Sequence, residues 1–127
     1  MTDAITPVDP PGLPSNPAFA HGMILPVAPT LYVGGQNGVD AEGVLLEGLQ
    51  AQTEQALRNV LAVLAAAGTD AAHTAKLTIY LDPGVDPDPA YEASRAVWTA
   101  RTAVTVLALA PARAGALVEI EAVATIP

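Results

Sequence analysis

The chain has 127 residues, of which 51% are hydrophobic, and a formal net charge of −8. This length suits a single domain around one hydrophobic core, and so apolar a composition excludes a disordered chain. The five lysines and arginines are scattered along the sequence, whereas nucleic-acid binding needs a clustered basic face. We therefore expect no nucleic-acid partner, and the absence of cysteine excludes disulfides and thiolate sites.

The sequence also argues against a membrane partner. Its beginning lacks the basic segment and apolar stretch of a signal peptide. The longest uninterrupted apolar run, residues 60–67, is far shorter than the roughly 20 residues that span a bilayer. We therefore expect a cytoplasmic protein.

Residues 1–17 are predicted to form a proline-rich N-terminal arm, followed by one folded domain in residues 18–127. Five prolines lie between Pro7 and Pro17. Proline fixes φ and removes a backbone donor, so the arm should be extended and should stay outside a central sheet. A weak strand is expected within residues 19–25.

The next segments predict a strand and then a helix. Residues 31–33 read as a short strand that ends at Gly34 and Gly35 in a hairpin. Such a glycine pair suits unusual backbone angles or the close approach of another group. From residue 49 to 67 the apolar residues recur at helical spacing, and Gly68 stands where a left-handed cap would end the helix.

The second half of the chain also alternates between predicted strands and helices. Residues 75–81 predict a strand, residues 88–98 a helix with Asp88 as its N-cap, and residues 102–109 a β-branched strand. With the last strand, the order predicts an α+β fold: one mixed, antiparallel-rich sheet with two helices on one face. The uncovered face of such a sheet would be buried in a homo-oligomer.

The C-terminal strand, residues 116–124, carries the chemistry. Alternation places its apolar residues on one face and Glu119 and Glu121 together on the other. Two neighbouring carboxylates on an apolar strand need partners. We expect Glu119 to belong to a small-molecule site with Arg101 as its companion. The alternatives are a cross-strand pair of Glu119 with Lys76, a structural role for Glu121, and an Arg101 that pairs with an acidic neighbour.

Four segments resemble the RidA (YjgF-like) reactive-intermediate deaminases, in the same order along the chain. They are residues 32–36 (YVGGQ), 51–60 (AQTEQALRNV), 76–81 (KLTIYL) and 118–124 (VEIEAVA). The resemblance implies a chorismate-mutase-like α+β domain and a homotrimer whose sheets face inward as a barrel. It also implies ligand clefts between subunits, in which small enamine or imine acids are hydrolysed to keto acids and ammonia without cofactor or metal.

The resemblance also implies site residues. Arg101 would clamp the substrate carboxylate, because a planar guanidinium forms two parallel charge-assisted bonds with it. Glu119 would orient and deprotonate the attacking water. The pocket would be lined by Phe19, Gly34, Gly35 and Ala103.

The chain departs from the family pattern at three points. Gly34 replaces a serine, Phe19 replaces a tyrosine, and the loop before Arg101 is shortened. These departures favour the alternative that the protein binds a small metabolite in the same clefts without deaminating it. The ribonuclease activity sometimes attached to this family is disfavoured by the acidic charge. His21 and His73 lie in no cluster at ligand spacing, so no metal site is expected.

Overall fold

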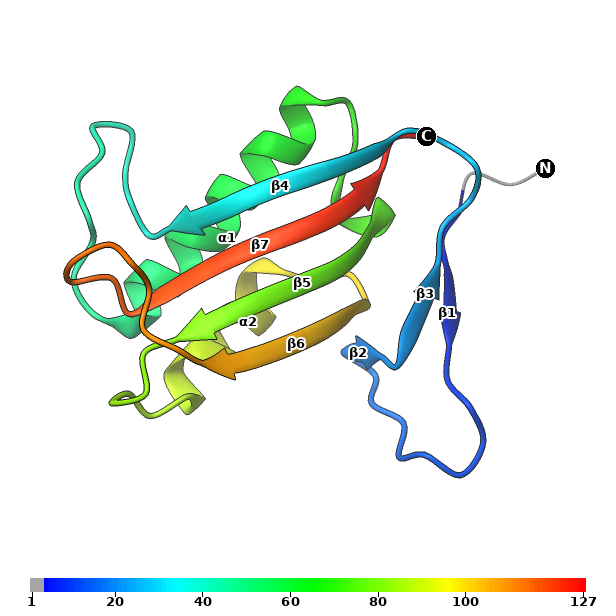
Figure 1. The fold of residues 1–127 in the computed structure, drawn as a ribbon, viewed down its shortest axis with the longest axis horizontal. Coiled ribbons are helices and arrows are strands. Elements are labelled where there is room, and N and C mark those ends of the chain that lie inside the picture. Colours follow the sequence, from blue (N-terminus) through cyan, green and yellow to red (C-terminus); the bar gives the residue numbers. More distant parts are fainter. Residues whose placement is uncertain (1–3) are drawn as a thin grey trace.

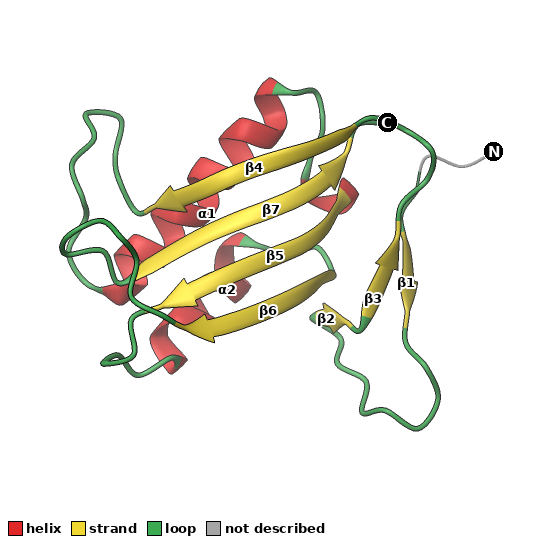
Figure 2. Ribbon diagram, viewed as in Figure 1, coloured by secondary structure: helices red, strands yellow, loops and turns green. Residues whose placement is uncertain are grey.

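The computed structural model describes residues 4–127 (Figure 1). Its elements are β1 (Thr6–Val8), β2 (Phe19–Ala20), β3 (Gly22–Ile24), β4 (Thr30–Asn37), α1 (Leu49–Ala66), a short 3₁₀ helix η1 (Ala71–His73), β5 (Thr74–Leu81), α2 (Asp88–Val97), β6 (Thr102–Ala108) and β7 (Val118–Thr125). Five strands form a sheet in the order β2-β6-β5-β7-β4. The first three are parallel to one another, whereas β7 is antiparallel to both of its neighbours. Both helices cover the same face (Figure 2), which confirms the predicted α+β fold.

The core lies between α1 and the glutamate-bearing strand β7. The apolar face of β7 is buried as the alternation predicts, with Val118 and Ile120 fully excluded from solvent. Leu57, Val60 and Leu64, one helical turn apart on α1, are equally buried and belong to the same cluster. The helix ends as predicted, because the next glycine, Gly68, has a φ of 81°.

Two local predictions are wrong. Strand β4 does not end at Gly34 but continues through both glycines to Asn37, pairing with β7 on either side of a bulge. Neither glycine has a left-handed φ, so they bend the strand rather than turn it. Helix α2 begins one residue early: Pro87 is its N-cap, and Asp88 lies in the first turn, where a carboxylate suits the helix dipole.

Part of the predicted N-terminal arm forms a small two-stranded ribbon with β3 beside the main sheet (Figure 1), while residues 1–3 of the predicted arm lie outside the described residues. Strand β1 pairs antiparallel with β3, and Pro7 lies opposite Met23. The strand expected within residues 19–25 is divided, because β2 instead pairs in parallel with β6. As the prolines predict, this part of the arm stays outside the five-stranded sheet.

Within one chain the sheet is open, not closed into a barrel, and its face opposite the helices is uncovered (Figure 2). Tyr32 of β4, on this face, is 76% exposed. No helix in residues 4–127 is long and apolar enough to cross a membrane. The predicted barrel would therefore need further copies of the chain.

Candidate functional site

The two glutamates of β7 lie on the uncovered face of the sheet and have different surroundings. Tyr80 of β5 donates a hydrogen bond from its hydroxyl to Oε1 of Glu121. This bond raises the pKa of Tyr80, and desolvation and the charges of Glu121 and Glu119 raise that pKa further. Glu121 therefore has a partner on the neighbouring strand, which is a tyrosine hydroxyl and not a cation.

Glu119 is held more loosely. Nδ2 of Asn37 donates to its Oε1 at 3.3 Å, while its Oε2 accepts no hydrogen bond from any residue in the described part of the chain. The carboxylate lies against the backbone of Gly35, where an added Cβ would come within 2.2 Å of Oε2. The close approach predicted for this glycine pair is therefore present, and its partner is Glu119.

The alternative pairing of Glu119 with Lys76 is not formed. The Lys76 ammonium instead donates to the hydroxyl of Thr105 on β6. Lys76, Gly34 and Glu121 line a shallow depression of about 290 Å³ on the same face. A side chain at position 34 would meet nothing within 4 Å, so the glycine there leaves this depression open.

Arg101, just before β6, ties the N-terminal arm to the domain. Its Nη1 lies 2.5 Å from Oδ2 of Asp9. Its Nε and Nη2 donate to the carbonyl of Asn16 at 3.2 and 3.0 Å, and Nη2 also donates to the carbonyl of Phe19. In this structure Arg101 thus has an acidic partner, as in the alternative interpretation, although that partner is 92 residues away.

The same contacts make the arm sensitive to acid. The hydrogen bonds from Arg101 and from the backbone of His21 hold the pKa of Asp9 below its ordinary 3.8. A lowered pKa means that this contribution to arm attachment is complete above the ordinary value and is lost as the pH falls through the lowered one. We expect the protection of the β1 and β3 amides, measured relative to their intrinsic exchange rates at each pH, to fall as the pH is lowered through the pKa of Asp9.

An Asp9→Asn variant provides the control for this pH effect. Its arm amides should exchange rapidly already at neutral pH, and their protection should no longer depend on acid. Arm amides that stay protected in Asp9→Asn would show that the Asp9 carboxylate does not hold the arm.

Five of the six predicted site residues fall into two groups within one chain, which are Gly34, Gly35 and Glu119 on one side and Arg101 and Ala103 on the other. Gly34, Gly35 and Glu119 lie on β4 and β7, toward the opposite edge of the sheet from β2 and β6. Ala103 is in register with Lys76, whereas Glu119 is in register with Tyr80. Four residues along the strands at about 3.3 Å each, and two strand spacings of about 4.8 Å, separate Ala103 from Glu119 by about 16 Å. The two groups do not meet within one chain.

Phe19 lies apart from both groups. Its partner in the sheet is Thr102, whose side chain is buried on the helix-covered face. The Phe19 ring packs edge-on against Tyr91 of α2, with 6.0 Å between the ring centroids. Phe19 therefore lines a pocket beneath α2 and not the depression beside Glu121 on the uncovered face.

Sequence reasoning missed two residues that position this site. Asp9 gave no local signal, because its contact with Arg101 depends on how the arm folds back. Asn37 looked like turn chemistry, yet it ends β4 opposite Glu119 and holds that carboxylate. Tyr80 could have been found, since strand alternation places it on the same face as Lys76.

The fold and sequence match known proteins. The family model described as Endoribonuclease L-PSP matches residues 14–126. The crystal structure of YyfB from Yersinia pestis, described as a protein of unknown function of the conserved Rid protein family, is 29% identical, covers 96% of this chain and 98% of its own, and has a TM-score of 0.80. RidA from the Antarctic bacterium Psychrobacter sp. is 28% identical over 99% of this chain and 97% of its own, with a TM-score of 0.66.

The YjgF gene product of E. coli supports the fold, with 23% identity, a TM-score of 0.67 and coverage of 85% and 87%. No curated protein matches the chain in sequence. The family model covers almost the whole described domain, and the fold matches that of a solved Rid-family structure over 96% of the chain. The chain therefore belongs to the endoribonuclease L-PSP family, which includes the Rid and YjgF proteins.

Proposed function

We propose that the protein hydrolyses small enamine or imine acids to keto acids and ammonia, at sites between copies of the chain. One observation carries the proposal. The carboxylate of Glu119 rests on the bare backbone of Gly35, has one oxygen that accepts no hydrogen bond within residues 4–127, and lies on an uncovered sheet face. A carboxylate placed in this way can bind and activate a water molecule.

The reaction needs a base and a proton carrier. Glu119 takes a proton from water as the water oxygen bonds to the C=N carbon, and the substrate nitrogen gains a proton. The carbinolamine then loses ammonia, its hydroxyl proton leaves, and the C=O bond of the keto acid forms. No electrons are gained or lost overall, so the chain's own acid and base groups suffice.

The substrate carboxylate needs a cation that Glu119 does not provide within its own chain. Because Ala103 and Glu119 are about 16 Å apart, we assign Arg101 and Ala103 of one copy and Gly34, Gly35 and Glu119 of the next to one composite cleft. A homotrimer with inward-facing sheets, as the resemblance to RidA implies, would bury the uncovered faces and form such clefts. The side chain of Phe19 lies on the opposite face of the sheet, so Phe19 contributes only its backbone carbonyl, which accepts a hydrogen bond from Arg101.

Asp9 competes with the substrate in this arrangement. Its carboxylate already occupies the Arg101 guanidinium, so the substrate must displace it or share the remaining donors. This engagement favours the second candidate, a protein that binds a small metabolite in the same cleft without deaminating it. The first candidate has the stronger support, because a binding protein would not need the half-free carboxylate of Glu119.

A coupled assay of 2-iminobutyrate and 2-iminopropionate hydrolysis separates the two candidates. We expect the wild type to accelerate hydrolysis and Arg101→Ala to lose most of the acceleration. Arg113→Ala is the matched control, because Arg113 donates to the carbonyl of Gly43 in a loop, and it should remain active. Inactivity of all three folded proteins would favour the second candidate, a protein that binds a metabolite without deaminating it. A fully active Arg101→Ala variant would show that Arg101 does not bind the substrate.

The family description as an endoribonuclease does not lead us to propose RNA as the substrate. The chain carries a net charge of −8 and only five lysines and arginines. Of those, Arg101 is engaged by Asp9 and Arg113 by a backbone carbonyl. A phosphate backbone would therefore meet little positive charge.

A further inference from the structure

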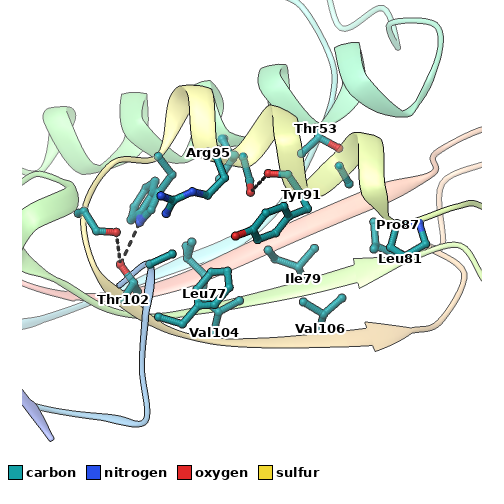
Figure 3. A pocket seen from close by; sticks show the side chains of 17 residues that line it. Thr53, Leu77, Ile79, Leu81, Pro87, Tyr91, Arg95, Thr102, Val104 and Val106 are labelled. Atoms are coloured by element: carbon teal, nitrogen blue, oxygen red, sulfur yellow. Dashed lines mark hydrogen bonds between the residues drawn. The ribbon is translucent and has the colours of Figure 1, made fainter. Parts of the chain in front are cut away.

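A second pocket lies on the other face of the sheet, between α2 and strands β5 and β6 (Figure 3). Its volume is about 260 Å³. Leu77 and Ile79 of β5 and Val104 of β6 form its floor, while Tyr91 and Arg95 project from α2 above them. It is therefore separated from Glu119 by the thickness of the sheet.

The pocket is open where α2 turns a small residue toward the sheet. The only buried residues of this helix are Ala90 and Ala93, and of these Ala90 lines the pocket. Its methyl group does not fill the space above the aliphatic side chains of the sheet. A larger residue in place of Ala90 would fill part of the pocket.

The interior of the pocket is apolar, and its polar atoms are paired. Nε1 of Trp98 donates to the hydroxyl of Thr102 at 2.9 Å. In the described chain, the one buried side-chain polar atom without a partner is the hydroxyl of Thr125, which does not line this pocket. An apolar cavity of about 150 Å³ stays dry and binds benzene, so this pocket has room for about ten non-hydrogen atoms.

The mouth of the pocket carries a single charge. Tyr91 and Arg95 lie four residues apart on α2, and both side chains extend over the pocket (Figure 3). Arg95 is the one charged residue of the lining, and its guanidinium forms no hydrogen bond or ion pair within residues 4–127. The Phe19 and Tyr91 rings, in edge-on contact, add an aromatic wall.

We propose that this pocket binds a small aromatic carboxylic acid. Its ring would lie between α2 and the sheet, in contact with the aromatic wall and with Trp98, and its carboxylate would reach Arg95 at the mouth. A guanidinium binds a carboxylate through paired charge-assisted hydrogen bonds, which fixes the orientation of the ligand. The site lies on the helix-covered face, and its occupancy does not depend on the hydrolysis proposed for the other face.

The single tryptophan provides the signal for a test. Trp98 lines the pocket and is only 6% exposed, so a ligand beside it should change its fluorescence. The probe is 3-phenylpropionate, which is transparent at the wavelengths that excite tryptophan, and 3-phenylpropanamide is the uncharged control. We expect a saturable change for the acid, with the amide binding about tenfold more weakly.

Substitutions inside and outside the pocket test where the ligand binds. Arg95→Gln should weaken binding of the acid about tenfold and leave the amide unchanged. Ile79→Phe fills the pocket and should abolish binding of both probes, with Val104→Phe as a second filler if the first fails to fold. Glu119→Gln should bind the acid as the wild type does, which separates this pocket from the proposed hydrolytic cleft.

Some results would overturn the proposal. A folded wild type whose Trp98 fluorescence shows no saturable response to either probe has no such site. Binding that survives in a folded pocket-filling variant lies elsewhere. If the acid and the amide bind with equal affinity and Arg95→Gln changes neither affinity, the pocket does not recognise a carboxylate.

Discussion

Glu119→Gln is expected to lower kcat/KM for imine hydrolysis by about 10²–10⁴-fold, because an amide cannot take the proton of the attacking water. Glutamine has the same shape and can still accept the 3.3 Å hydrogen bond from Asn37. Substrate binding should therefore persist, and the loss should appear mainly in kcat. Steady-state kinetics with 2-iminobutyrate measure both quantities.

Glu121→Gln is the matched control for this prediction. Glu121 lies two residues further along β7 on the same face, but its carboxylate is already engaged by the hydroxyl of Tyr80. The amide oxygen of glutamine can accept that bond, so activity should stay close to that of the wild type. Equal losses in the two variants would contradict a special role for Glu119.

The largest expected effect on stability comes from Leu57→Ala. Leu57 lies at the middle of α1, is fully buried, and belongs to the cluster that holds Ile120 of β7. Its truncation should lower the free energy of unfolding by about 2–5 kcal/mol, because the lost apolar contacts leave a cavity. Urea unfolding at a fixed protein concentration, followed by Trp98 fluorescence, measures this difference.

Leu61→Ala tests whether burial sets that cost. Leu61 lies one turn further along α1 but is only partly buried against the same cluster. The same chemical change should therefore destabilise the protein less than Leu57→Ala does. A loss as large as that of Leu57→Ala would contradict burial as the source of the cost, because helix propensity favours alanine at both positions.

Local periodicity was enough to predict most of the fold. The helical spacing from residue 49 and the alternation around Glu119 each report which side chains face the core, and both are properties of short segments. Apolar residues of β7 are buried and its glutamates are not, as the alternation requires. The order of these elements along the chain then indicated one α+β sheet.

The site was predicted less completely, because its geometry depends on contacts between distant segments. The pairing of Asp9 with Arg101 forms only when the arm folds back onto β6, and no local pattern reports it. Gly34 and Gly35 were read as a turn, yet their role depends on the carboxylate that β7 places opposite Gly35. The order and the register of the strands together decide that Ala103 and Glu119 lie far apart in one chain.

The measurement that tests the composite cleft most directly is complementation between two inactive variants. Arg101→Ala and Glu119→Gln are unfolded together, mixed in equal amounts, refolded and assayed for 2-iminobutyrate hydrolysis. Random assembly of a trimer places an intact Arg101 opposite an intact Glu119 at one interface in four, so about a quarter of the wild-type rate should return. Each variant refolded alone should stay inactive. A mixture as inactive as its components would contradict a site shared between two copies of the chain.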